Sequence, residues 1–176
     1  MAGCLVLVVG PSGAGKDTLI RLARAALADD SRYVFPRRLV TRPPSADEDN
    51  DEIDAAAFAA GCAAGRFTLH WHAHGLGYAI PAEAGRLAAA GHVVVCNVSR
   101  RVVAQARAAG RPVSVVEITA PPAILMRRLA ARGRAEDGDL AARLAREVAV
   151  EADLRILNVG VPEAGAAQLI AHLCAC

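Results

Sequence analysis

Aromatic side chains and lysine are both scarce in this chain of 176 residues: aromatics make up 3% of it, and lysine occurs once. Few aromatics argue against a surface on which nucleobases stack. A formal net charge of only +2 gives no electrostatic case for a nucleic-acid partner. No apolar run approaches the roughly 20 residues that span a membrane. We therefore expect one globular domain, with neither nucleic acid nor membrane as its partner. The sequence assigns no oligomeric state.

The five cysteines are odd in number and irregular in spacing, so they do not form a disulfide framework. Cys4 and Cys96 lie within apolar runs, where a thiol serves as a small hydrophobic side chain. This usage is typical of a reducing compartment and predicts a cytoplasmic protein. A redox or metal pair formed by Cys174 and Cys176 is a weaker alternative.

The basic residues are unevenly divided, because 19 of the 20 are arginine and only Lys16 is lysine. Alanine fills 40 positions, so the composition is biased toward alanine and arginine. A bias that replaced every other lysine spared Lys16. We infer a chemical reason, since an ammonium on a thin, flexible stem reaches places that a guanidinium fork cannot.

Apolar runs alternate with stretches of helical periodicity along the whole chain. This alternation predicts an α/β fold with a mostly parallel sheet flanked by helices. The acidic stretch 47–54 is expected to be a loop, and residues 133–138 a polar break. The expected strands are 4–9, 33–40, 66–71, 77–80, 93–98, 112–119 and 155–158, and the expected helices are 16–28, 55–64, 81–90, 101–109, 121–132, 140–152 and 162–173.

A glycine-rich segment between the first expected strand and helix fits seven positions of the nucleotide-phosphate motif GxxxxGK[ST]. Its glycines allow backbone N–H groups to surround a phosphate chain, and the following helix adds positive potential. Lys16 would reach the β- and γ-phosphates of ATP. The segment is Gly10, Pro11, Ser12, Gly13, Ala14, Gly15 and Lys16.

The residue after the lysine departs from this motif, since Asp17 stands where a serine or threonine is usual, and Thr18 follows. A carboxylate is a hard oxygen ligand, which suits Mg²⁺. The expected strand 93–98 has no acid at its carboxyl end, so Asp17 is predicted to supply that charge to the metal, directly or through water. The alternative is that Asp17 only favours the helix N-terminus electrostatically.

Two groups of arginines could bind further phosphate, because guanidinium forks bind phosphate bidentately. Arg38 and Arg42 are expected to bind an acceptor phosphate. Residues 132–138 are expected to form a cationic lid that carries Arg132 and Arg134, and these two arginines and Arg143 are expected to act in phosphoryl transfer. For Arg127 and Arg128 we expect at least one to be simply solvated.

His70, His72 and His74 alternate ahead of a turn expected at Gly75, and Tyr78 follows it. On one strand face they could bind zinc, but no other ligand residue lies near them in sequence. A polar wall against a sugar, with His70 and His72 as contacts and Tyr78 donating to a phosphate, is the preferred interpretation.

Nearly the whole chain resembles the guanylate-kinase-like branch of P-loop kinases, through GPSGAGKD, VTRPP, GRFTL, the glycine turn ending in Tyr78 and the RGR segment. Within it, GPSGAGKDTL, RRLVTRP, HWHAHGLGYAIP and NVSR resemble the ribose 1,5-bisphosphate phosphokinases. The resemblance implies one domain over 1–176, an acceptor-binding region at about 32–90 and a lid at about 132–140. It also implies ATP with Mg²⁺, and conversion of ribose 1,5-bisphosphate to 5-phosphoribosyl 1-diphosphate in phosphonate breakdown.

Differences from guanylate kinase concern the acceptor. The resemblance places His70 where that enzyme reads guanine with a glutamate, and Ala79 and Ile80 replace a glycine and a hydroxyl residue. It also places Asn158 near adenine and lets Arg132 stack on the base. Two alternatives stay open: a nucleoside monophosphate kinase, and a binding module without catalysis.

Overall fold

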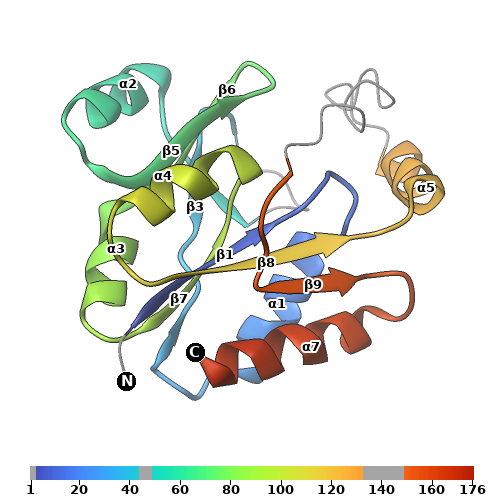
Figure 1. Cartoon of the computed structure of the whole chain (residues 1–176). Helices are drawn as coiled ribbons and strands as arrows, with labels where there is room; N and C mark the ends of the chain where they lie inside the picture. The colour runs from blue at the N-terminus through green and yellow to red at the C-terminus, as the bar shows by residue number, and fades with distance from the viewer. Residues whose placement is uncertain (1–2, 44–48, 133–148) are drawn as a thin grey trace.

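A five-stranded parallel sheet forms the centre of the computed structural model, which describes residues 3–43, 49–132 and 149–176 (Figure 1). Its order is β2-β7-β1-β8-β9, and every neighbouring pair is parallel. β1 is buried along its whole length, as expected for a strand covered on both faces. The strands are β1 (Cys4–Val9), β2 (Tyr33–Val34), β7 (Val93–Asn97), β8 (Val113–Thr119) and β9 (Leu154–Leu157).

Helices cover both faces of this sheet, and the alternation along β1 divides the core between them. Val6 and Val8 face one core cluster, whereas Leu5, Leu7 and Val9 face the other. The first cluster includes residues of α1 (Lys16–Ala26) and α7 (Pro162–Ala175), and the second includes residues of α3 (Ala82–Ala89), the 3₁₀ helix η1 (Arg100–Val102) and α4 (Val103–Ala108). α5 (Pro122–Arg132) follows β8 at the carboxyl edge of the sheet (Figure 1).

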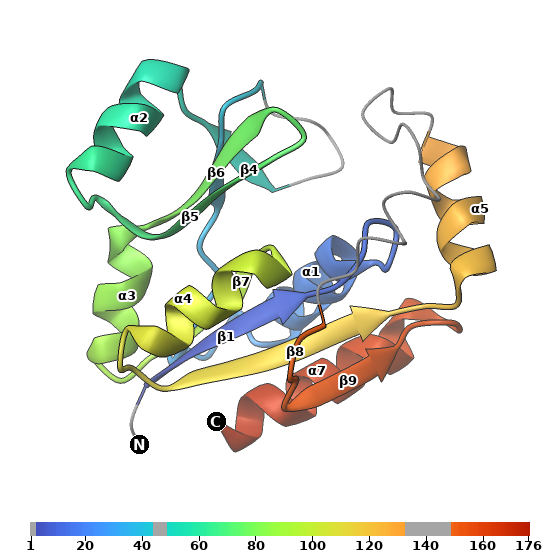
Figure 2. The same cartoon turned by 45° about the horizontal axis from the view of Figure 1, so that its top comes forward.

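A second, four-stranded sheet lies beside the first, as Figure 2 shows, with α2 (Ala55–Ala63) on its far side. Its order is β4-β3-β6-β5. β5 and β6 form a hairpin whose turn is His74 and Gly75, with φ of 53° and 74°. Such two-residue turns need positive φ at both positions, so the expected turn at Gly75 is confirmed. The strands are β3 (Arg38–Val40), β4 (Asn50–Glu52), β5 (Phe67–Ala73) and β6 (Leu76–Pro81).

The α/β fold with a mostly parallel sheet is confirmed, but two segments differ from their predictions. The expected strand 33–40 is two strands, β2 and β3, in different sheets. The acidic segment is not entirely a loop, because residues 50–52 form β4. Asn50 explains this, since its buried side chain accepts a hydrogen bond from Arg38 Nε at 3.0 Å. The expected break 133–138 and most of the expected helix 140–152 lie outside the described residues.

The five thiols are free and differ widely in exposure. Cys4 and Cys96 are buried on β1 and β7. Burial raises the pKa of the Cys4 thiol to about 11 and that of Cys96 to about 12. Cys174, near the end of α7, is exposed. Among the described residues, no helix is long and apolar enough to cross a membrane.

We predict that iodoacetamide at pH 8 alkylates Cys174 first and leaves Cys4 and Cys96 unmodified until the protein unfolds. The raised pKa keeps these two thiols protonated at that pH, which lowers the reactive thiolate fraction roughly 10²-fold for Cys4, and burial blocks access as well. Peptide mass spectrometry of the native and urea-unfolded protein measures the order. Alkylation of Cys96 in the native protein at the rate of Cys174 would contradict the buried position of β7.

Candidate active site

The glycine loop, residues 10–15, joins β1 to α1 at the carboxyl edge of the parallel sheet, which is where ligands bind in such folds. Two of its glycines have no room for a side chain. A Cβ on Gly10, with φ of 141°, would lie 1.9 Å from the carbonyl oxygen of Ile118. A Cβ on Gly15, with φ of 93°, would lie 2.4 Å from Asn158 Nδ2. The loop can therefore pack against β8 and Asn158 only because these residues are glycine.

The outer side of this loop is held by two side chains. Asn158, which follows β9 and is buried, donates from Nδ2 to the carbonyl of Ala14 at 2.8 Å. Arg128 of α5 donates to the carbonyl of Gly13 at 3.3 Å and to that of Asn158 at 3.0 Å. In a trans peptide the C=O and the next N–H point in opposite directions. Holding the Ala14 carbonyl outward therefore directs the Gly15 N–H into the loop, where a phosphate can accept from it.

Lys16 lies at the start of α1, and its ammonium is held within the loop. Nζ donates to the carbonyls of Gly10 at 2.8 Å and Pro11 at 3.0 Å. These contacts keep the positive charge beside the N-terminus of α1, whose unpaired N–H groups add to the same potential. The loop, the helix end and the ammonium together form an anion site of the kind that the motif predicts.

Asp17 lies in the first turn of α1 and contacts the end of the neighbouring strand β7. Its Oδ1 accepts a hydrogen bond from Asn97 Nδ2 at 2.8 Å. Across the described residues, Asn97 Oδ1 is the only buried side-chain oxygen or nitrogen without a hydrogen-bond partner. An unpaired buried acceptor is costly, and this one lies next to a carboxylate and the phosphate loop. The Asp17 carboxylate and Asn97 Oδ1 together fit a hydrated magnesium ion, because Mg²⁺ takes oxygen ligands and usually keeps several waters.

The acceptor side of the site is built on the second sheet. Val40 pairs with Tyr78 across β3 and β6, and the Arg38 guanidinium lies over the Tyr78 ring at 5.3 Å. Trp71 pairs with Tyr78 from β5, and the two rings stack at 5.4 Å with 6° between their planes. The structure thus brings two of the predicted acceptor residues, Arg38 and Tyr78, together on one face of the sheet.

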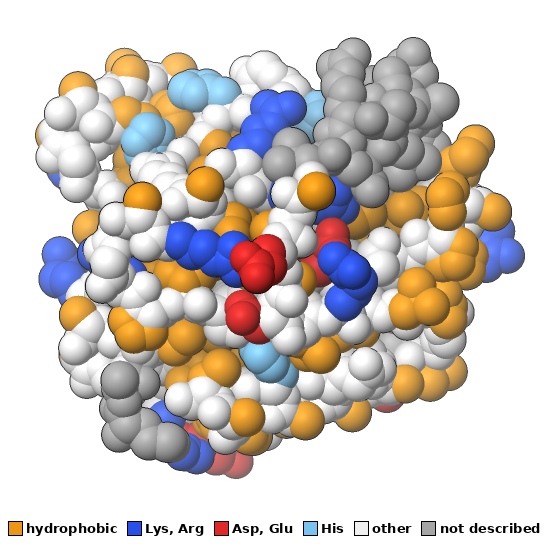
Figure 3. Space-filling view, in the orientation of Figure 1, with side chains coloured by type: hydrophobic (Ala, Val, Ile, Leu, Met, Phe, Trp, Pro, Cys, Tyr) orange, Lys and Arg blue, Asp and Glu red, His pale blue; other side chains and the backbone are white. Residues whose placement is uncertain are grey.

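The histidines take the other face, because successive side chains along a strand point to opposite sides. Phe58 of α2 meets the ring of His70 at 6.4 Å and that of His72 at 5.2 Å, edge to face. The structure therefore does not bring His70 and His72 together with Arg38 and Tyr78. Histidine side chains gather over this part of the surface at the upper left of Figure 3.

Sequence reasoning singled out Ile80 but missed Leu69 and Trp71, which lie with Ile80 on the face of the sheet that carries Tyr78. Leu69 and Ile80 belong, with Trp71, to the buried cluster on the inner face of the hairpin. The signal was available: once Tyr78 is taken as facing the site, the two-residue period of β5 and β6 places Leu69, Trp71 and Ile80 on the same side. The expectation that at least one of Arg127 and Arg128 is solvated is confirmed, because Arg127 is exposed. An arginine-rich helix has no sequence pattern that singles out Arg128 as the residue that contacts the loop.

The remaining predicted arginines are less fully placed. Arg37 forms ion pairs with Asp49 and Asp51, at 2.8 and 2.9 Å. Arg42 directly follows Thr41, whose hydroxyl accepts from the Gly77 N–H at 2.8 Å, so the backbone carrying Arg42 is tied to β6. Arg132 ends α5. Its side chain, and all of Arg134 and Arg143, lie outside the described residues.

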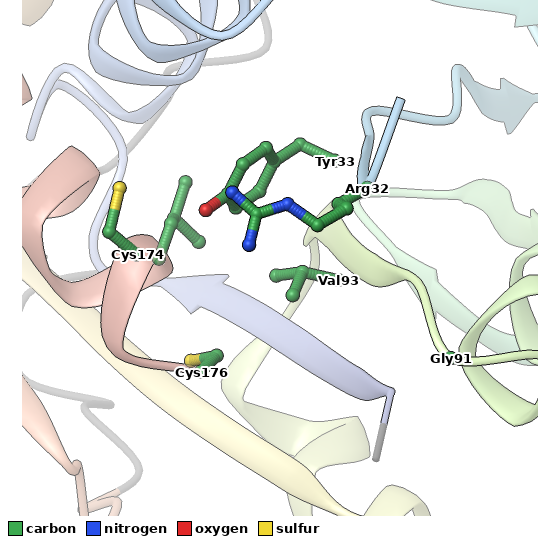
Figure 4. A pocket seen from close by; sticks show the side chains of 7 residues that line it. Arg32, Tyr33, Gly91, Val93, Cys174 and Cys176 are labelled. Carbon is green, nitrogen blue, oxygen red and sulfur yellow. The ribbon is translucent and has the colours of Figure 1, made fainter. Parts of the chain in front are cut away.

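A small cavity of about 100 Å³ lies at the opposite, amino edge of the sheet (Figure 4). A hydrogen bond with Cys174 raises the pKa of the Tyr33 hydroxyl, and burial raises the pKa of the Cys176 thiol. The cavity is bordered by the starts of β2 and β7, so the length of the strands separates it from the phosphate loop. It is lined by Arg32, Tyr33, Gly91, Val93, Leu173, Cys174 and Cys176.

Known proteins match this chain over most or all of its length. A family described as AAA domain matches residues 5–150. The ribose 1,5-bisphosphate phosphokinase PhnN of Methylobacterium radiotolerans is 80% identical over all 176 residues, and covers 100% of both chains. That of Bradyrhizobium diazoefficiens is 53% identical over 96% of this chain and 86% of its own. A crystal structure of guanylate kinase from Anaplasma phagocytophilum matches 99% of this chain and 86% of its own, with a TM-score of 0.67 and 19% identity.

The structural match shows that the fold is that of guanylate kinase, at 19% sequence identity. The two phosphokinases match nearly the whole chain at 80% and 53% identity, far more than a shared fold alone requires. The chain belongs to the ribose 1,5-bisphosphate phosphokinase family of P-loop kinases.

Proposed function

We propose that this protein transfers the γ-phosphoryl group of ATP to the 1-phosphate of ribose 1,5-bisphosphate, forming 5-phosphoribosyl 1-diphosphate and ADP. The observation that carries the proposal is the inner face of the hairpin. There a cation and a phenol, Arg38 and Tyr78, stand beside the apolar side chains Leu69 and Ile80. A phosphate can bind to the first pair, but a nucleobase would find apolar side chains where hydrogen-bonding groups are needed to read it.

The chemistry asks little of a general base. An oxygen of the acceptor 1-phosphate is already anionic, so it can attack the γ-phosphorus as the bond to the ADP oxygen breaks, without a proton being removed first. The protein's part is positioning and charge neutralisation. Lys16 and backbone N–H groups of the glycine loop, among them that of Gly15, hold the ATP phosphates. Arg38, Arg42 and Tyr78 hold the acceptor phosphate in line with them.

Asp17 and Asn97 are the residues that would hold magnesium in this site. The contact between them at 2.8 Å fixes the carboxylate, and the unpaired Asn97 oxygen is left to accept from a water. When bound, Mg²⁺ supplies positive charge to the β- and γ-phosphate oxygens. Asn97 thus supplies an oxygen at the carboxyl end of β7, where the sequence has no acid, and Asp17 supplies the negative charge.

The rest of the assignment extends the family's pattern to this chain. Arg132 and Arg134, from the lid at about 132–140, and Arg143, which follows the lid, would neutralise the migrating phosphoryl group. The acceptor-binding region spans about 32–90, and Asn158 lies on the adenine side of the loop. We leave His70 and His72 out of the acceptor contacts, because their rings meet Phe58 on the far face. We assign the reaction to phosphonate breakdown, in line with the PhnN relatives, and to the cytoplasm.

Replacing Lys16 by arginine should abolish most turnover although the charge is kept. Nζ lies within 3.0 Å of two loop carbonyls, and a planar guanidinium fork does not fit that space. We expect at least a ~10²-fold loss of kcat, the scale of one preorganised charge contact. Arg21→Lys, on the exposed side of the same helix, is the matched control and should keep wild-type kcat. Near wild-type kcat in Lys16→Arg would refute the argument.

The acceptor is tested directly by a product assay. With ATP and Mg²⁺, the protein should convert ribose 1,5-bisphosphate to 5-phosphoribosyl 1-diphosphate with kcat/KM at least ~10²-fold above that for GMP, since Leu69 and Ile80 leave the base unread. Chromatography with phosphorus NMR identifies the product. A clear preference for GMP would establish instead a nucleoside monophosphate kinase.

The metal role of Asp17 is tested by magnesium titration of three proteins. Asp17→Asn keeps an oxygen that can accept from Asn97 but removes the charge, so the Mg²⁺ concentration for half-maximal activity should rise. Asp17→Ser restores the usual loop residue and should recover part of the activity. Isothermal titration of ATP with and without Mg²⁺ should show a weaker effect of Asp17→Asn without the metal. One shared magnesium dependence for all three would reduce Asp17 to a helix-terminus residue.

A further inference from the structure

We propose that Trp71 is a positioning residue for the acceptor phosphate: stacked beneath Tyr78, it holds Tyr78 and Arg38 in the arrangement that receives the phosphate. This inference rests on the proposed function and deepens it. Trp71 itself touches no phosphate in this scheme, and it acts through the two side chains above it.

Side chains from three neighbouring strands, β5, β6 and β3 (Figure 2), form one column on the inner face of the second sheet. Trp71 is its base, Tyr78 stacks on Trp71 almost parallel with the ring centroids 5.4 Å apart, and the Arg38 guanidinium lies over the Tyr78 ring at 5.3 Å. Trp71 is 8% exposed and belongs to the core cluster that also contains Val98 and Val102. The base of the column is therefore anchored in the core, whereas Tyr78 above it is only half-buried.

The column fixes the two groups that bind the acceptor. Arg38 is held at two points, by the ring of Tyr78 and by Asn50, which accepts from Nε at 3.0 Å and is itself 4% exposed. Tyr78 has a flat partner below it, which restricts the tilt of its ring. A long arginine and a half-buried tyrosine would otherwise lose rotamer freedom when the phosphate binds. Ordering them in advance lowers that loss and so lowers KM for the acceptor.

The opposite face of the same sheet offers a matched comparison. Phe67 and Phe58 also stack there, at 5.8 Å with 23° between their planes. Phe67 is on the same strand as Trp71, but its stack with Phe58 includes neither Arg38 nor Tyr78. A substitution of Phe67 therefore shows the effect of losing aromatic packing on β5 while the column stays intact.

The test compares Trp71→Leu, Trp71→Phe and Phe67→Leu with the wild type. Trp71→Leu should raise KM for ribose 1,5-bisphosphate about tenfold, the scale of one aromatic stack plus one cation–π contact, while KM for ATP stays within about twofold. Trp71→Phe keeps a ring under Tyr78 and should restore most of the affinity. Phe67→Leu should leave both KM values unchanged, whatever its effect on thermal unfolding. Equal acceptor KM in the wild type and Trp71→Leu would overturn the inference, as would parallel rises for both substrates.

A second readout needs no turnover, because Trp71 is the only tryptophan in the chain. Its fluorescence reports on the column itself. Ribose 1,5-bisphosphate without ATP should change the emission of the wild type saturably, and ATP alone should not. An emission that the acceptor leaves unchanged, at concentrations that saturate binding in calorimetry, would count against the column.

The two proposals fail in different ways. If the wild type phosphorylates ribose 1,5-bisphosphate but Trp71→Leu behaves like it, only the role of Trp71 is wrong. If the wild type does not phosphorylate ribose 1,5-bisphosphate, the proposed function is wrong, and the same KM comparison with the phosphorylated acceptor that it does use decides about Trp71.

Discussion

The hydrogen bond from Asn158 to the Ala14 carbonyl, at 2.8 Å, is the contact on which the site depends. It joins the end of β9 to the phosphate loop, which comes much earlier in the chain, and Arg128 reinforces it from α5. A loop of glycines has no preferred shape of its own. The neighbouring elements must therefore fix the shape of the loop. They do so by packing against it at distances that only glycine permits. The orientation of the phosphate-binding N–H groups is thus a property of the assembled sheet rather than of the motif alone.

Neighbouring arginines in the acceptor region have different roles: Arg37 is structural, and Arg38 is the proposed phosphate contact. Arg37 pairs with Asp49 and Asp51, and its neighbour Arg38 contacts Asn50 and the ring of Tyr78. The short strand β4 thus has two roles: Asp51, with Asp49 just before the strand, pairs with Arg37, and the buried amide of Asn50 orients Arg38.

The local motifs of the site could be predicted from the sequence, whereas features that depend on contacts between distant segments could not. The phosphate loop, its lysine and the strand–helix alternation are local patterns, so the sequence predicted them correctly. The face of a strand on which a side chain lies depends on pairing with distant strands, and the histidines, which look like a ready-made polar wall, lie with Phe58 because Trp71 takes the inner side. β4 was missed because its stability comes from Arg38, twelve residues earlier, and not from its own polar sequence.

The single lysine has a consequence for the protein's covalent chemistry. Every other side-chain cation in the chain is a guanidinium or an imidazole, so Lys16 carries the only side-chain primary amine. Acylating reagents, and enzymes that modify lysine, thus meet one side-chain target, and it is the ammonium that the loop holds against the Gly10 and Pro11 carbonyls. In most proteins such modification is spread over a surface and is largely silent. Here, modification of the Lys16 amine alone would remove the positive charge from the phosphate loop and so directly alter the nucleotide site.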